Sequence, residues 1–225
     1  MSNAQNIIQG YVATEAIPAY RAPIFDTSAD RSAKLPTAAN QRALGVVDEH
    51  GQADAAGDVA AVIRTGWAKA EVAAAVTRGD RLNIAGSTGK LKAAVASLSV
   101  DMTAANADFT ITALTQGAEG DRWSLVLIDP GADNTLAAEI YDHEVRVVLG
   151  YATGAVNTIA NDLETLLEAI PEFAANLTFA HTGASDGTGL LNAMDKTYLS
   201  GGGNDFCEAL ESATADTQII QVQID

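Results

Sequence analysis

The sequence predicts a mainly β protein, in which a small β-barrel or β-sandwich core is interrupted by an inserted α+β domain. Three observations support this prediction. Short apolar runs in the first part are separated by turn residues at roughly 8–12-residue spacing, which is typical of small barrels and sandwiches. From Asp108 the pattern changes to further strands and an amphipathic helix, and after Gly201 strand-like runs return. We therefore expect a discontinuous β core at residues 1–100 and 204–225, and an inserted domain at residues 101–203.

The first part of the chain is predicted to form strands bounded by glycines, which favour tight turns. These strands are Ala43–Asp48, Asp58–Arg64, Arg81–Ala85 and Lys90–Ala94. The polar segment Thr27–Gln41 contains Pro36 and is predicted as coil or a short turn. The alanine-rich segment Trp67–Val76 is compatible with both helix and strand, so its structure stays open.

The middle part is predicted to combine strands with helices. Apolar residues alternate with threonines from Phe109 to Ala113, as in a half-buried strand. The other predicted strands are Trp123–Asp129, Glu144–Leu149 and Leu177–Ala180, the first two joined through the turn Asp129–Gly131. The segment Thr188–Lys196 is predicted to be a short helix.

Asn157–Ile170 has the strongest helical pattern in the sequence. Its apolar residues fall on one face at helical spacing, and its acidic residues point away from that face. Asn157 is the expected N-cap, and Pro171 is expected to end the helix because it lacks a backbone N–H.

The last part of the chain returns to strands, and the charge distribution follows the same division. Phe206–Leu210 and Gln218–Ile224 are predicted strands, the second with strict alternation of apolar and polar residues from Ile220. Residues 105–203 carry 14 acidic and three basic side chains, whereas the remainder carries 15 and 10. The net charge is therefore −11 in the expected insertion and −5 in the remainder.

The overall charge excludes several classes of partner. The formal net charge is −16, and no run of lysine or arginine is present to neutralise phosphates, so nucleic acid is not expected as a partner. An anionic membrane would repel the chain, and no apolar stretch approaches the ~20 residues that span a bilayer. No charged-then-apolar leader opens the sequence, so a secretory signal is not expected and synthesis in the cytoplasm is expected.

The short motifs in the sequence do not form a catalytic, cofactor or metal site. Arg78-Gly79-Asp80 matches an integrin-type tripeptide, but a turn before the next strand is the favoured reading. The glycine-rich segment Gly183–Gly189 lacks the lysine of a phosphate loop. Asp129, Asp133 and Asn134 miss the spacing of a calcium loop and favour a solvated turn.

Isolated histidine, cysteine and tryptophan residues give no stronger signal. His143 has no second histidine four residues away, so it does not form a zinc-binding helix motif. Cys207 stands in a strand-like run and is expected to be a small buried apolar residue. Trp67 and Trp123 are expected to be core or interface anchors. We therefore expect no enzyme, no cofactor and no bound metal.

The first and last parts of the sequence resemble the small head-decoration, or cement, proteins of tailed bacteriophages. The segments that carry the resemblance are Gly10–Val12, Ala43–Val47, Ala56–Val62, Arg78–Leu82, Gly89–Leu91, Cys207–Ala213 and Ile219–Ile224. In that family the Gly-Lys strand is followed closely by the Ala-Leu-Glu strand, whereas about a hundred residues intervene here. The intervening part resembles a module of phage capsid and tail proteins in Phe109–Leu114, Gly117–Asp121, Asp129–Gly131, Asn157–Ile170 and Leu199–Gly202.

The resemblance implies a structural virion protein rather than an enzyme. Proteins of this kind bind the outer surface of the mature head and clamp neighbouring major capsid subunits, usually as trimers at three-fold or quasi-three-fold positions. The implied partners are therefore the major capsid protein and further copies of this chain. The N-terminal arm Ser2–Gly10 is expected to be free in the isolated protein and to add a strand to a capsid sheet. Its candidate capsid-binding residues are Asn6, Ile7, Ile8 and Gln9.

Two other functions stay open. A phage tail or baseplate module would share the inserted domain but would not need the decoration-like first and last parts. A module that binds carbohydrate at the host surface would use exposed aromatic residues of the insertion, such as Tyr141 and Tyr151.

Overall fold

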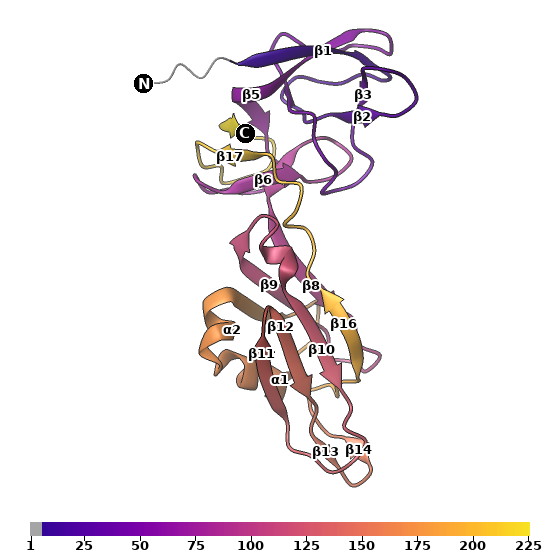
Figure 1. Cartoon of the computed structure of the whole chain (residues 1–225), viewed down its shortest axis with the longest axis vertical. Helices are drawn as coiled ribbons and strands as arrows, with labels where there is room; N and C mark the ends of the chain where they lie inside the picture. Colours follow the sequence, from indigo (N-terminus) through magenta and orange to yellow (C-terminus); the bar gives the residue numbers. More distant parts are fainter. Residues whose placement is uncertain (1–5) are drawn as a thin grey trace. The chain divides into compact units, whose positions relative to one another are not determined.

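The computed structural model describes residues 6–225 and confirms a mainly β protein, with 44% of residues in strands and 8% in helices. The chain divides into two compact units (Figure 1). Unit 1 takes in the described chain up to Ala94 together with Gly203–Asp225, and unit 2 is Val95–Gly202. None of the helices in residues 6–225 has the length and apolar character needed to cross a membrane.

Unit 1 contains a curled sheet that forms half a barrel. Its strand order is β2-β3-β1-β5-β18-β17-β6-β7, and β4 also pairs with β5. The strands are β1 (Ile7–Ala13), β2 (Ile24–Asp26), β3 (Ser32–Lys34), β4 (Val46–Val47), β5 (Val59–Glu71), β6 (Arg81–Ile84), β7 (Leu91–Ala93), β17 (Cys207–Ala209) and β18 (Ile219–Ile224). The alanine-rich segment that sequence patterns left open is thus in part a strand, because Trp67–Glu71 belongs to β5.

Strand β5 organises this sheet because it pairs with three other strands. Its first half pairs antiparallel with β1, from Thr65 opposite Ile7 to Val59 opposite Val12. Its second half pairs antiparallel with β18. The partner changes at Gly66, whose φ of +100° suits glycine, since other residues rarely adopt positive values.

Ion pairs join the C-terminal segment of unit 1 to the rest of the unit. Arg81 contacts Asp205 at 2.7 Å and Asp225 at 2.6 Å, and Lys90 contacts Asp216 at 2.7 Å. The hydrogen bond from Lys90 lowers the pKa of the Asp216 carboxyl. These contacts supplement the strand pairing, since partly exposed ion pairs contribute little stability on their own.

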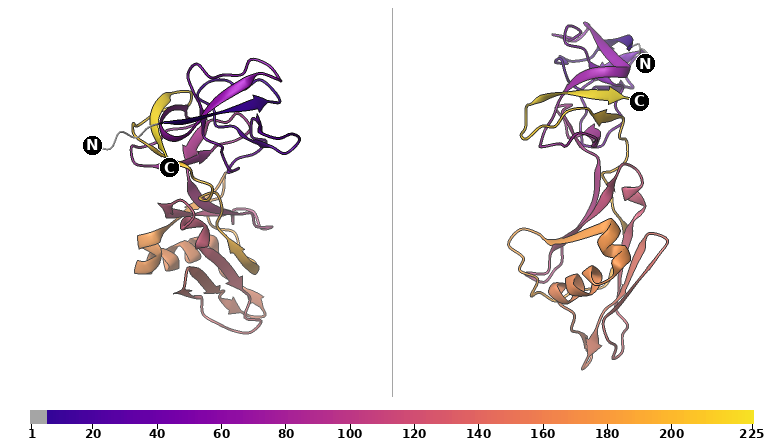
Figure 2. Two further views of the ribbon diagram at one scale, coloured as in Figure 1. Left: turned by 45° about the horizontal axis from the view of Figure 1, so that its top comes forward. Right: turned by 90° about the vertical axis from the view of Figure 1, so that its left-hand side faces the viewer.

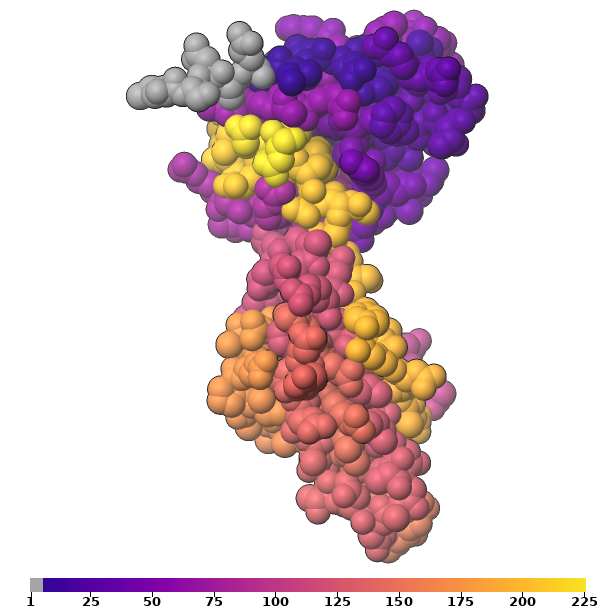
Figure 3. Space-filling view, viewed as in Figure 1, coloured from indigo at the N-terminus to yellow at the C-terminus, as the bar shows by residue number. Residues whose placement is uncertain are grey.

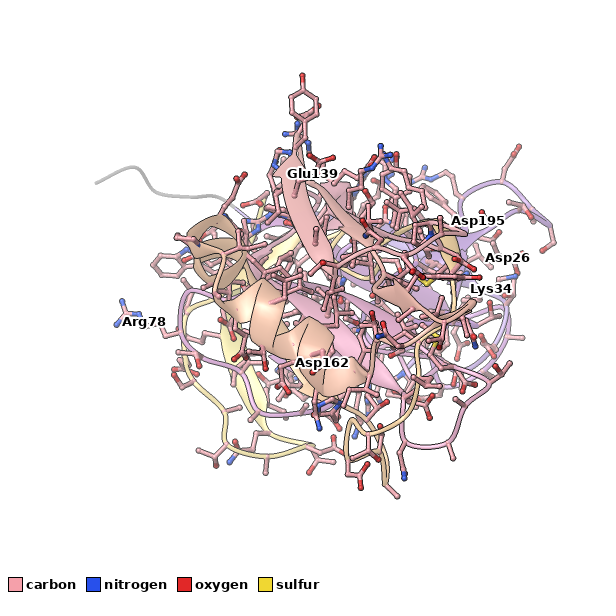
Figure 4. All side chains as sticks on the ribbon, turned by 90° about the horizontal axis from the view of Figure 1, so that it is seen from below. Asp26, Lys34, Arg78, Glu139, Asp162 and Asp195 are labelled. Atoms are coloured by element: carbon pink, nitrogen blue, oxygen red, sulfur yellow. The ribbon has the colours of Figure 1, made fainter. Side chains whose placement is uncertain are left out.

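A smaller polar cluster fixes the β2–β3 pair. Asp26 accepts a hydrogen bond from the Thr14 hydroxyl at 2.7 Å, which is the main reason that the pKa of its carboxyl is lowered to about 2. The Lys34 ammonium lies 3.6 Å from the Asp26 carboxylate, and both residues are labelled in Figure 4. The short strand β3 lies within the segment that the sequence predicts as coil, and its ends depend on these tertiary contacts.

Unit 2 contains a four-stranded sheet of order β11-β12-β10-β16 and a three-stranded sheet of order β15-β9-β8. The strands of unit 2 are β8 (Val95–Val100), β9 (Phe109–Gln116), β10 (Ser124–Ile128), β11 (Ala137–Tyr141), β12 (Glu144–Val148), β13 (Tyr151–Ala152), β14 (Ala155–Val156), β15 (Leu177–His181) and β16 (Met194–Tyr198). A short 3-10 helix, η1 (Gly120–Arg122), precedes β10, and β13 pairs with β14.

The two helices of unit 2 cover one core. Helix α1 (Ala160–Glu168) packs against β15 and β11, which belong to different sheets, and α2 (Pro171–Asn176) packs against β15 and β9 (Figure 2). The buried residues of both sheets and both helices form a single apolar cluster, which includes Ile111, Leu125, Val147, Leu163 and Phe173.

The predicted helices differ from the observed ones in their limits. Helix α1 begins at Ala160, and its N-cap residue Ile159 makes no side-chain capping bond. The carbonyls of Gly187 and Gly189 instead accept hydrogen bonds from its first N–H groups, which replaces the cap expected from Asn157. Helix α1 ends at Glu168 rather than at Ile170, and Pro171 begins α2, since a proline is tolerated in the first turn.

Three further features differ from the sequence predictions. Thr188–Lys196 is not a helix: Met194–Lys196 lies in β16, and Leu190 forms an isolated β-bridge with Ile159. Strand β11 was missed because none of its side chains is fully buried: Ala138 and Ile140 pack against the core but are only partly buried. The division between the units at Ala94 also places β8 in unit 2, although residues up to 100 were assigned to the core.

We predict that each unit has its own unfolding transition. Leu82 is fully buried in unit 1 and Leu163 in unit 2. Leu82→Ala and Leu163→Ala should each destabilise one unit by about 2–5 kcal/mol, because each leaves a cavity in one core. Calorimetry of the full chain should show two transitions, each variant lowering a different one. A single transition lowered by both variants would contradict this.

Candidate functional site

The candidate capsid-binding residues lie at the start of β1 in unit 1. Ile7, Ile8 and Gln9 belong to this strand and pair with β5, so this part of the arm is held within the protein's own sheet. This corrects the expectation of an arm that is unpaired as far as Gly10. Residues 2–5 of the arm lie outside the described residues.

Asn6 anchors β1 to the centre of β5. Its side-chain amide donates a hydrogen bond to the Trp67 carbonyl at 2.9 Å, and its Oδ1 accepts one from the Trp67 N–H at 2.9 Å. The side chain thereby imitates the paired bonds of an antiparallel ladder. Gly66 makes room for this contact, since a Cβ at Gly66 would overlap the Asn6 Oδ1.

Gln9 also has a role within the fold. Its Oε1 accepts hydrogen bonds from the Tyr11 hydroxyl at 3.0 Å and from Arg64 at 3.1 Å. Tyr11 is buried, so Gln9 satisfies a polar group at the edge of the core. Of the four candidate residues, Ile7 and Ile8 therefore present the exposed apolar surface.

An apolar stripe runs along the outer face of β1 and β5 and consists of Ile8, Val12 and Val59. Their exposed fractions are 53%, 46% and 61%. Val12 and Val59 are direct partners in the antiparallel pair, so their side chains share a face, and Ile8 lies on that face by the two-residue alternation of a strand. Gly10 stands between Ile8 and Val12 and leaves the stripe without a polar interruption.

The same strand has a free edge. Strand β3 pairs with β1 only at Val12 and Ala13, so within the described chain Ile7–Tyr11 pairs with a strand on the β5 side alone. Arg31 makes a long contact of 3.5 Å to the Gly10 carbonyl. A free edge exposes backbone donors and acceptors that can pair with another chain. Figure 3 shows β1, in indigo, at the surface of unit 1.

Trp67 adds a large aromatic group on the outside of β5. Its side chain is 62% exposed, and it borders a cavity of about 180 Å³ together with Asn6, Glu49 and Lys69. The hydrogen bond between Lys69 and Glu49, at 3.0 Å, raises the pKa of the Lys69 ammonium and lowers that of the Glu49 carboxyl. Trp67 is therefore an exposed aromatic side chain beside the ion pair of Lys69 and Glu49.

The motifs of the sequence take ordinary structural places. The hydrogen bonds of Thr77 and Asp80 close a turn at the Arg78-Gly79-Asp80 tripeptide. Asp129 accepts a bond from the Gly131 N–H within its own turn. Residues 6–225 contain no group of three or more histidine, cysteine, aspartate or glutamate side chains that could hold a metal ion.

Cys207 and Trp123 are core residues. Cys207 is fully buried, and burial raises the pKa of its thiol well above the usual range, so it stays protonated. Trp123 is buried, and its ring meets the His143 ring edge-on, with 4.9 Å between the ring centroids.

Comparison of the sequence with known protein families finds no matching family, and comparison with curated proteins finds no match. The sequence pointed to the exposed pair Ile7–Ile8 because these isoleucines stand in an uncharged N-terminal segment that could add a strand to a sheet edge. It missed Val12 and Val59, since only the register of β1 against β5 places both on the same face.

We predict that Gly66→Ala loosens the start of β1. Gly57 is a matched control, because its φ is +96° and a Cβ there meets nothing within 4 Å. Both variants carry the strain of a positive φ, but only Gly66→Ala displaces Asn6, so it should cost about 1–2 kcal/mol more. Chemical denaturation should show this difference, and amide exchange should accelerate at Ile8 in Gly66→Ala alone. Equal losses and unchanged exchange would refute the anchoring role of Asn6.

Proposed function

We propose that this protein is a structural component of a phage virion that binds the outer surface of the mature head and stabilises contacts between major capsid subunits. The observation that supports the proposal best is the coincidence of the free edge of β1 with the apolar stripe of Ile8, Val12 and Val59. A strand added to this edge would gain backbone hydrogen bonds and cover part of the stripe.

This pair of features suits strand addition better than binding of a small molecule. Backbone pairing gives affinity, and side chains next to the added strand give specificity. Trp67 would act as a further anchor, because aromatic residues dominate the binding energy of many interfaces. A partner with an exposed strand, repeated many times on a shell, is the kind of surface that this geometry fits.

Assembly as a homotrimer is the second part of the proposal. The buried residues of unit 1 are rich in alanine and valine, which limits the area that its core removes from water. A symmetric oligomer adds shared apolar surface, and several weak contacts from one trimer to the shell reinforce one another. Localisation on the outside of the virion follows from this role.

We predict that Ile8→Asp weakens attachment to heads of the phage that encodes this protein, prepared without it. A buried carboxylate in the stripe would lose its hydration without gaining a partner, so binding should fall at least about tenfold. Leu114→Asp is the control, because Leu114 is 53% exposed but belongs to unit 2. Co-sedimentation with heads measures attachment, and thermal unfolding shows whether the variants are folded.

The same assay distinguishes attachment to the head from the alternative role as a tail or baseplate module. Wild-type protein should also raise the temperature at which these heads are disrupted, since binding one state of the shell stabilises that state. Attachment of Ile8→Asp equal to wild type would contradict the role of the stripe. Binding to isolated tails but not to heads would favour a tail or baseplate module.

A further inference from the structure

A hollow in unit 2 has the size and chemistry of a ligand site. It has a volume of about 680 Å³ and lies between α1, the start of the β13–β14 hairpin and the chain before β11. Volumes of several hundred Å³ are typical of small-molecule sites. The helix and the hairpin that line it can be followed in Figure 2.

The hollow contains polar side chains that the fold does not use. Asp162 on α1, labelled in Figure 4, is exposed, and the described residues provide no partner for its carboxylate. Asn157 and the Tyr151 hydroxyl likewise have no side-chain hydrogen-bond partner within residues 6–225. A carboxylate, an amide and a phenol supply both acceptors and donors on one concave surface.

Hydrogen bonds within unit 2 connect the segments behind these side chains. Asn134 and Tyr151 form a β-bridge with backbone hydrogen bonds of 3.0 and 2.9 Å, which positions the tyrosine. The Thr158 hydroxyl accepts a bond from the Gly150 N–H at 2.7 Å. A Cβ at Gly150 would lie 2.7 Å from the Asn157 Oδ1, so glycine leaves the space that the amide occupies. Contacts within unit 2 therefore fix the backbone that carries Tyr151 and leave the space for the Asn157 amide.

The surroundings select the class of ligand. Leu136, Leu166 and the half-buried Tyr151 ring give an apolar wall. The lining contains no lysine, arginine or histidine, and unit 2 carries 15 acidic and three basic side chains, so anions are disfavoured. A single carboxylate is a poor set of ligands for a divalent cation. A neutral ligand that carries paired hydroxyl groups and an apolar ring face would match both the polar and the apolar parts of this surface.

We propose that this hollow binds a neutral saccharide, with the sugar ring stacked on Tyr151 and its hydroxyls bonded to Asp162 and Asn157. The inference rests on unit 2 alone and does not depend on attachment to a capsid. It would add recognition of a glycan surface to the proposed structural role.

The test titrates the full-length ¹⁵N-labelled protein with maltoheptaose, cellohexaose and N-acetylglucosamine tetramer, and with glucose 6-phosphate as an anionic probe. At least one neutral saccharide should shift the amide signals of Tyr151 and Asp162 at millimolar concentration. Tyr151→Ala and Asp162→Ala should each weaken this binding about tenfold. Tyr151→Phe, which keeps the ring, should bind more tightly than Tyr151→Ala even if the alanine variant is less stable.

Tyr141 is the matched control because it is 83% exposed in the same unit and does not line the hollow. Tyr141→Ala should bind as wild type. The proposal is overturned if none of the neutral saccharides binds up to 10 mM, or if glucose 6-phosphate binds more tightly than they do. It is also overturned if binding survives Tyr151→Ala or is lost equally in Tyr141→Ala.

Discussion

The pairing of β18 with the second half of β5 is the contact on which the rest of unit 1 depends. Six residue pairs join these strands, from Ile219 opposite Glu71 to Ile224 opposite Gly66. Because residues 95–202 stand between the two parts of the unit, this pairing must close a very long loop. The entropic cost of closure grows only slowly with loop length, so it can be offset by burying the inner face of β18. Ile220, Val222 and Ile224 on that face are almost completely buried.

The candidate interface depends on the same strand. Gly66 marks the position where β5 exchanges β1 for β18 as its partner, and Asn6 extends the β1 edge across this position by bonding to Trp67. The register of β1, and with it the shared face of Ile8, Val12 and Val59, is thus determined by β5. The hollow of unit 2 has a separate frame, built on α1 and the bridge between Asn134 and Tyr151.

Sequence patterns predicted those elements that have a regular buried face, such as the alternating segments Phe109–Ala113 and Ile220–Ile224. They failed where tertiary contacts decide the structure. The carbonyls that cap α1 come from Gly187 and Gly189, and the exposed strand β11 exists because β12 offers it an edge. The same limit applies to the sites: Ile7 and Ile8 stand out in the sequence, whereas the grouping of Val12 with Val59, and of Asn157 with Asp162, needs the register and the fold.

Deleting residues 95–202 and joining Ala94 to Gly203 through a short Gly/Ser linker tests most directly whether β5 and β18 alone complete unit 1. The shortened chain should unfold in one cooperative thermal transition. Amide exchange at the paired residues Ala68, Ala70 and Val222 should be slow, as in the full chain. If the shortened chain stays unfolded under conditions where the full chain folds, β5 and β18 do not complete unit 1 by themselves, and a single larger fold must replace the two units.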